Sequence, residues 1–194
     1  MQLYIAAAIG RSGTQLSAFD HALTLTGVAD RNLIRLSSVI PPGSEVICTS
    51  EVPDTVGGTW GDRLYVVYAE QRTEEPGTEV WAGVGWIADP VTKRGLFVEH
   101  EGTSEAFVRD QISTSLEDLR RHRDDGDLGP PQMHVIGATC TGQATCALVV
   151  CVYAVEPWQD ATDETAQPTR SRRTSLPLAL RGSSSTKITL VGHL

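Results

Sequence analysis

The alternation of apolar and polar residues predicts a chain of eight strands and two helices. Short apolar runs bounded by glycine, proline or charged turns are typical of strands. The predicted strands are 2–9, 31–37, 45–50, 64–69, 80–88, 95–101, 133–139 and 144–155. Stretches 14–26 and 103–122 instead place apolar residues three and four apart, which indicates helices. This order of elements predicts a layered α+β domain.

The first predicted helix carries a carboxylate on or beside its apolar face. Leu16, Phe19 and Leu23 are spaced for one helical face, and Asp20 falls among them. An unpaired charge is costly to bury, so the pattern leaves two interpretations. Asp20 is either buried and unusual or, as the pattern alone favours, at the edge of the face with its carboxylate in water.

The stretch from Asn32 to Pro42 combines a predicted strand with a rigid stop. Pro41 and Pro42 cannot donate to a strand ladder, so the strand must end before them. Ser37 and Ser38 lie at this end, where a backbone can be held under strain. From this stretch alone, an ordinary polar turn is the simpler interpretation.

Three segments resemble the pyruvoyl-dependent arginine decarboxylase family. They are SAFDHAL from Ser17, NLIRLSSVIPP from Asn32 and GLFVEHEG from Gly95, and the similarity extends from about Leu3 to about Glu156. The resemblance implies a domain over 1–156 that cleaves its own backbone between Ser37 and Ser38. It also implies a four-layer αββα sandwich with mostly antiparallel sheets, and a trimer with active sites between subunits.

In the family's mechanism the second serine supplies the cofactor. The Ser38 hydroxyl would attack the carbonyl of Ser37, and elimination of the resulting ester would leave dehydroalanine. Loss of ammonia to water then produces a pyruvoyl group. The implied reaction converts L-arginine to agmatine and carbon dioxide through a Schiff base with this group, without a metal or a separate cofactor. A serine hydroxyl is a weak nucleophile unless it is activated.

The resemblance assigns roles to further residues. Glu99 is expected to protonate the carbon that loses carbon dioxide, and Asp20 to bind the guanidinium group of the substrate. Asn32 is expected to orient the substrate, and Leu16 and Val39 to contact it. A general acid needs a pKa near the working pH, and burial raises that of a carboxyl group.

Some alternatives stay open. Glu101 would share a strand face with Glu99 and could take its role. Arg31 stands where an apolar residue is expected, and it could repel a cationic substrate or point to solvent. The enzyme could therefore act on another amino acid, or the scaffold could be an uncleaved binding protein without enzymatic activity.

Composition narrows the range of partners and locations. The 194 residues suit one domain followed by a polar tail over 157–194 that lacks periodicity, and we expect this tail to be disordered. The net charge of −8 argues against nucleic acid as a partner and suits a small cationic substrate. The sequence contains neither an apolar run long enough for a membrane helix nor an evident signal peptide, which predicts a cytoplasmic location.

The four cysteines follow no zinc-binding spacing. A bridge between Cys140 and Cys146 is geometrically possible across a predicted hairpin. We expect buried free thiols instead, as is usual in a cytosolic chain.

Overall fold

The fold is built around two β-sheets, and the chain crosses from one sheet to the other. The computed structural model describes residues 1–123 and 128–158. The first part contains β1 (Gln2–Ser12), α1 (Gln15–Leu25), β2 (Asn32–Arg35), β3 (Val39–Ile40), β4 (Glu45–Thr49), a 3-10 turn (Asp54–Val56), β5 (Arg63–Thr73), β6 (Glu79–Ala88), β7 (Gly95–Gly102) and α2 (Glu105–Arg121). Strands β8 (Gln132–Thr139) and β9 (Ala144–Glu156) follow.

The chain divides into two units, Met1–Asp160 and Ala161–Leu194. All the elements above belong to the first unit. The second unit, and with it nearly all of the expected disordered tail, lies outside the described residues.

The strands form a five-stranded sheet in the order β2-β5-β9-β1-β4 and a four-stranded sheet in the order β3-β7-β6-β8. Most neighbouring strands are antiparallel; β1 with β4 and β2 with β5 are the parallel pairs. Strand β9 lies at the centre of the five-stranded sheet and is buried from Ala144 to Val152. Its nearly continuous apolar sequence predicts this position, because both of its faces are covered.

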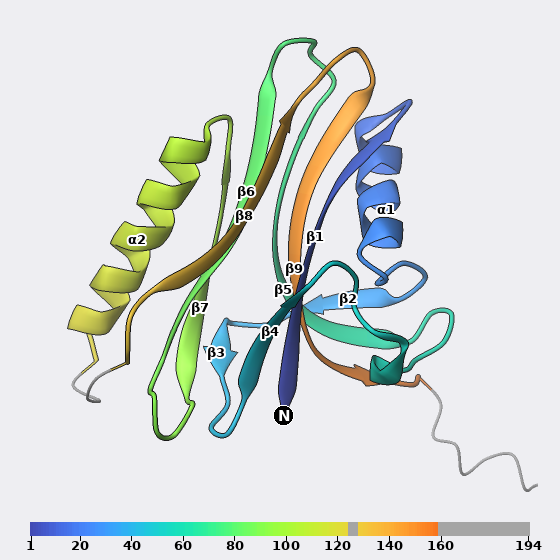
Figure 1. Ribbon diagram of the computed structural model, residues 1–194. Coiled ribbons are helices and arrows are strands. Elements are labelled where there is room, and N and C mark those ends of the chain that lie inside the picture. The colour runs from blue at the N-terminus through green and yellow to red at the C-terminus, as the bar shows by residue number, and fades with distance from the viewer. Residues whose placement is uncertain (124–127, 159–194) are drawn as a thin grey trace, which may run out of the picture. The chain divides into compact units, whose positions relative to one another are not determined.

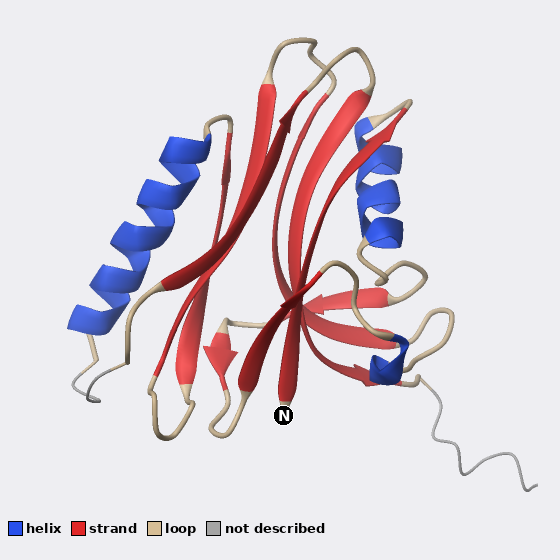
Figure 2. Ribbon diagram, viewed as in Figure 1, coloured by secondary structure: helices blue, strands red, loops and turns tan. Residues whose placement is uncertain are grey.

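The two sheets pack face to face, and each carries one helix on its outer face (Figures 1 and 2). One apolar cluster fills the space between the sheets and includes Ile5, Val67 and Phe97. A second cluster joins α1 to the five-stranded sheet, and a third joins α2 to the four-stranded sheet. These three cores separate four layers, so the expected αββα sandwich is confirmed.

Helix α1 buries only part of the predicted face: Phe19 and Leu23 pack, partly buried, against the core beneath the helix. Its buried residues are Ala18 and Ala22, whereas Leu16 is 71% exposed. The reason lies in the sheet beneath it, where a β-carbon on Gly10 would stand 2.0 Å from the carbonyl oxygen of Ala18. The helix backbone approaches the sheet so closely that only small residues fit at the contact, and the larger side chains lie to the sides.

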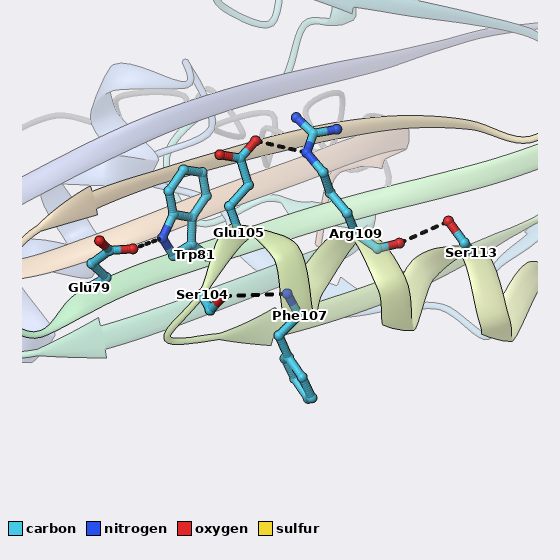
Figure 3. Close-up of polar contacts among 7 residues, drawn as sticks. All are labelled: Glu79, Trp81, Ser104, Glu105, Phe107, Arg109 and Ser113. Atoms are coloured by element: carbon cyan, nitrogen blue, oxygen red, sulfur yellow. Dashed lines mark hydrogen bonds and ion pairs between the residues drawn. The ribbon is translucent and has the colours of Figure 1, made fainter.

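Helix α2 follows the predicted pattern except at its start. Ser104, not the predicted Thr103, is the N-cap and accepts a hydrogen bond from the backbone of Phe107 (Figure 3). The apolar residues Val108, Ile112 and Leu116 recur at every fourth position and are buried. These side chains pack over glycines of β6, where larger residues would collide with the helix.

The described residues contain no disulfide. Cys140, Cys146 and Cys151 are buried free thiols, as expected, but Cys48 is exposed because β4 is an edge strand. None of the described helices has both the length and the apolar character needed to cross a membrane.

Candidate active site

The two adjacent serines lie where the chain passes from one sheet to the other. Strand β2 ends at Arg35, and the amide of Leu36 still donates to Val66 in the five-stranded sheet at 2.9 Å. Ser38 already belongs to the other sheet, because its carbonyl oxygen accepts a hydrogen bond of 2.8 Å from the amide of Phe97. The single strand predicted over 31–37 is thus shorter, and Val39–Ile40 form a separate strand paired with β7.

The crossing places Ser38 in a backbone conformation that non-glycine residues rarely adopt. Its φ is 67°, in the left-handed region. For a residue with a β-carbon this conformation costs about 1–2 kcal/mol, because the β-carbon crowds the neighbouring carbonyl oxygen. Hydrogen bonds at Leu36 and Ser38, on either side of Ser37, hold the chain there. The peptide between the serines is therefore flanked by strained backbone, as is common at reactive sites.

The hydroxyl of Ser38 is engaged by a buried carboxylate. It donates to Oε1 of Glu99 at 2.7 Å, and the Glu99 side chain is 11% exposed. On β7 the alternation of side chains directs Phe97 and Glu99 towards the space between the sheets. Leu96 and Val98 face α2, as the sequence predicts.

Two opposing influences act on the carboxyl group of Glu99. Burial raises its pKa, while the hydrogen bond from Ser38 and the nearby Arg35 lower it, and the net direction is upward. The Arg35 guanidinium lies 3.8 Å from Glu99 and 5.0 Å from the centre of the Tyr68 ring. Because the Arg35 side chain is 53% exposed, solvent weakens its effect on the carboxylate.

A cleft of about 490 Å³ reaches the serine pair from the side of α2. Glu99 and both serines line one part of it. The opposite part comes from the last turns of α2 and from His100, whose ring is 2.8 Å from the hydroxyl of Ser115. Solvent and small molecules can therefore approach the peptide that joins the serines.

The structure thus brings together Ser37, Ser38, Val39 and Glu99. Val39 follows Ser38 directly and is 55% exposed beside the site. Glu101, the alternative to Glu99, is exposed, and the hydrogen bond of Ser38 goes to Glu99.

The other predicted site residues lie elsewhere in the chain. Leu16 and Asp20 line a separate hollow on the outer surface of α1, and both are exposed. Asn32 begins β2 and its side-chain amide donates to the carbonyl oxygen of Gly61. Within one chain, these residues are not gathered around Ser38.

Arg31 neither faces the candidate site nor extends into solvent. Its guanidinium donates to the carbonyl oxygen of Gly27 at 2.9 Å and to that of Gly57 at 3.0 Å. It therefore ties the end of α1 to the loop after the 3-10 turn. The departure from an apolar residue has a structural explanation.

Sequence reasoning overlooked the contributions of Arg35, Phe97 and Tyr153. Arg35 interrupts the apolar run before the serines, and this interruption was the available signal. Phe97 contributes its backbone amide, and Tyr153 donates to the carbonyl oxygen of Val39 at 3.1 Å. No side-chain pattern reveals a backbone donor or a contact between residues more than a hundred positions apart.

Comparisons with known proteins place the chain in a class of enzymes, the decarboxylases that depend on a pyruvoyl group. Residues 2–157 match the family model described as pyruvoyl-dependent arginine decarboxylase. The chain belongs to this family, and its cofactor is a pyruvoyl group, as the resemblance implies.

Several archaeal relatives carry that same description. The protein of Thermococcus kodakarensis is 31% identical over 156 residues, which cover 80% of this chain and 94% of the relative. That of Halobacterium salinarum strain R1 is 32% identical, with 78% and 93% covered. The Pyrococcus abyssi protein is 38% identical over 111 residues, with 55% and 68% covered.

A solved structure of pyruvoyl-dependent histidine decarboxylase at pH 8 is a more distant match. It has a TM-score of 0.37 and 14% identity, and the match covers 73% of this chain and 62% of that one. At this distance the similarity carries no argument about the site.

Proposed function

We propose that this chain cuts itself between Ser37 and Ser38 and then decarboxylates L-arginine to agmatine and carbon dioxide. The observation that carries the proposal is the geometry at Ser38. A strained φ of 67° coincides with a hydroxyl held at 2.7 Å by a buried carboxylate. An ordinary polar turn has no need of a buried carboxylate bound to its hydroxyl.

Glu99 activates the nucleophile in the first step. The Ser38 hydroxyl attacks the carbonyl carbon of Ser37, and the peptide bond is exchanged for an ester. An ionised Glu99 accepts the hydroxyl proton, which is the role of a general base within hydrogen-bond reach. Relief of the left-handed backbone at Ser38 lowers the barrier further, because the strain is present in the ground state.

Glu99 serves again during decarboxylation. The pyruvoyl group supplies an electron-accepting ketone at residue 38. Because Glu99 already lies beside the Ser38 side chain, it is well placed to return a proton to the substrate carbon that loses carbon dioxide. Its raised pKa favours the protonated acid that this step requires.

Recognition of the guanidinium group requires a second subunit. Helices α1 and α2 cover opposite outer faces of the two sheets (Figure 1). Asp20 and Leu16 lie exposed on α1, while the cleft at Ser38 is lined by residues of α2. If all of these residues contact one substrate molecule, α1 must come from a neighbouring copy. This separation supports active sites between subunits, and the resemblance to the family implies that the subunits form a trimer. Asp20 would form a charge-assisted bond to the guanidinium.

Mass spectrometry of the purified chain tests the self-cleavage. We expect two fragments, 1–37 and 38–194, the second beginning with a pyruvoyl group. The Ser38→Ala protein should stay in one piece, since it lacks the nucleophile. A continuous wild-type chain without a reactive carbonyl would instead favour an uncleaved binding protein.

Assays with several amino acids test the substrate. Carbon dioxide and agmatine are expected from L-arginine. Release from another amino acid, with none from arginine, would keep the chemistry and overturn the proposed specificity.

A further inference from the structure

Two consecutive carbonyl groups just after the cleavage point are each held by a hydrogen bond. The amide of Phe97 donates to the carbonyl oxygen of Ser38 at 2.8 Å. The hydroxyl of Tyr153 donates to that of Val39 at 3.1 Å. The rings of Phe97 and Tyr153 also pack edge to face, with centroids 6.1 Å apart. The two donors thus form one unit.

This unit is rigid and keeps its donors in place. Phe97 is 1% exposed in the core between the sheets and is anchored in β7. Tyr153 belongs to β9 of the other sheet and is half-buried. Burial raises the pKa of Tyr153, so its hydroxyl remains protonated and able to donate. The contact therefore links the two sheets directly behind the cleavage point.

We propose that the Phe97 amide is a catalytic donor to the Ser38 carbonyl oxygen and that Tyr153 is a positioning residue for it. This inference rests on the proposed self-cleavage. It concerns the step after the ester has formed, in which the α-hydrogen of Ser38 must be removed. The negative charge that develops in this step spreads onto the carbonyl oxygen of Ser38.

The step balances without any further reactant. After the first step, the oxygen of the Ser38 side chain carries the acyl group of Ser37, and the nitrogen of Ser38 is a free amine. A base takes the α-hydrogen, the electron pair forms a double bond between the α- and β-carbons, and the β-carbon–oxygen bond breaks. Ser37 leaves as a carboxylate. Water then replaces the nitrogen, which departs as ammonia.

A donor aimed at the Ser38 oxygen lowers the barrier to this elimination, because it stabilises charge that appears only in the transition state. A preorganised backbone amide in a buried strand also requires no reorganisation when the charge develops. The Ser38 carbonyl group remains in the chain after cleavage, because its bonds to the α-carbon and to the nitrogen of Val39 are not broken. The donor is therefore available again when electrons are released from the substrate.

Tyr153 contributes through geometry. By holding the carbonyl of Val39, it fixes the Val39–Ile40 peptide and so limits rotation of the preceding peptide, which carries the Ser38 carbonyl. Without the hydroxyl, this segment could rotate and the bond from Phe97 would lengthen. The ring contact would remain in Tyr153→Phe, which isolates the effect of the hydroxyl.

Chemical trapping of the ester intermediate distinguishes a slow elimination step from a general defect in folding. Newly synthesised chain is sampled over time and treated with hydroxylamine, which cleaves an ester and leaves a hydroxamate on Ser37. Mass spectrometry then gives the amounts of intact chain, ester and final product. In Tyr153→Phe we expect elimination to slow about tenfold, the equivalent of one hydrogen bond, and the ester to accumulate. Tyr65→Phe is the matched control, because it loses a hydroxyl contact to Glu156 away from the site.

Replacement of the Phe97 amide by a backbone ester, through incorporation of phenyllactic acid, removes the donor itself. We expect elimination to slow about 100-fold, as for the loss of a donor to a developing oxyanion. A backbone ester at Val98, the next position of the same strand, is the control. If the residue 97 ester does not fold, the Tyr153 variant alone decides the question.

The outcomes are distinct. Accumulation of the ester in Tyr153→Phe or in the residue 97 variant, but not in the controls, supports the inference. Cleavage at the wild-type rate, or slow cleavage without a trapped ester, overturns it while leaving the proposed function intact. A wild-type chain that never cleaves overturns both.

Discussion

The crossing at Ser37–Ser38 and the outer surface of α1 are opposite kinds of site. At the crossing, one chain supplies the Ser38 hydroxyl, the buried Glu99 and the Phe97 amide, which are joined by hydrogen bonds. On α1, Leu16 and Asp20 lie exposed around a shallow hollow. In the proposed function, self-cleavage uses groups of one chain, whereas recognition of the substrate uses the α1 surface of a neighbouring copy.

Loss of the Glu99 carboxylate should affect the crossing most. Glu99→Gln keeps the shape of the side chain but cannot accept the Ser38 proton, nor donate one with the strength of a carboxylic acid. We expect both self-cleavage and turnover per pyruvoyl group to fall by roughly two orders of magnitude, as is typical of general acid–base residues. Fragment masses and carbon dioxide release measure the two rates.

Glu101→Gln is the matched control for this change, because Glu101 is exposed two residues further along β7. It should leave both rates near those of the wild type. A large loss in Glu101→Gln with none in Glu99→Gln would transfer the role to Glu101 and contradict the account of the crossing.

Asp20→Asn should damage the α1 surface without damage to the crossing. Self-cleavage is expected to be normal, while kcat/KM for arginine falls roughly 10- to 100-fold, the equivalent of a charge-assisted hydrogen bond. Asp110→Asn, a change at an exposed acidic residue of α2, serves as the control. Slow self-cleavage in Asp20→Asn would show that the two regions are not separate.

Mixed assemblies sharpen the comparison. Ser38→Ala chains keep the α1 surface but make no pyruvoyl group, and Asp20→Asn chains make the group but lack the carboxylate. If active sites form between subunits, co-expression of the two should restore part of the activity that neither has alone. Absence of any restoration in assemblies shown to be mixed would mean that both residues act within one chain.

The raised pKa of Glu99 predicts opposite pH dependences for the two reactions. Self-cleavage needs the ionised carboxylate, so its rate should fall as the pH decreases through this pKa. Protonation of the substrate carbon needs the neutral acid, so decarboxylation should fall as the pH increases through the pKa of Glu99 in the cleaved enzyme, which no longer has the hydrogen bond from the Ser38 hydroxyl that lowers this pKa. Each limb approaches about a tenfold change per pH unit. Rates measured across the pH range should lose both limbs in Glu99→Gln.

Arg31→Met should have the smallest effect on function. The change removes the hydrogen bonds to Gly27 and Gly57 and should lower the free energy of unfolding by about 2 kcal/mol. KM for arginine should not change, because this guanidinium is turned into the protein. Denaturant titration and steady-state kinetics measure the two quantities. A marked decrease in KM would instead place Arg31 at the rim of the substrate pocket.

Local sequence patterns predicted most of the helices and strands, because these elements depend on interactions between residues that are close in the sequence. The continuous apolar run of β9 marks a central strand, and Thr14 and Gly27 bound the first helix as predicted. The buried face of α1 was right at Phe19 and Leu23 but wrong at Leu16, and the closest contact is made by Ala18 and Ala22 beside Gly10. Leu16 had the right spacing but lies exposed.

The sequence by itself determined which residues have the required chemistry: a serine with a hydroxyl on its β-carbon, a glutamate at position 99 and an aspartate at position 20. Only the tertiary structure decided which of them meet. Ser38 and Glu99 come together because the chain changes sheets at the serine pair and then pairs with β7, a contact between residues 61 positions apart. Such contacts follow from the packing of whole layers, which a local pattern of residues does not encode.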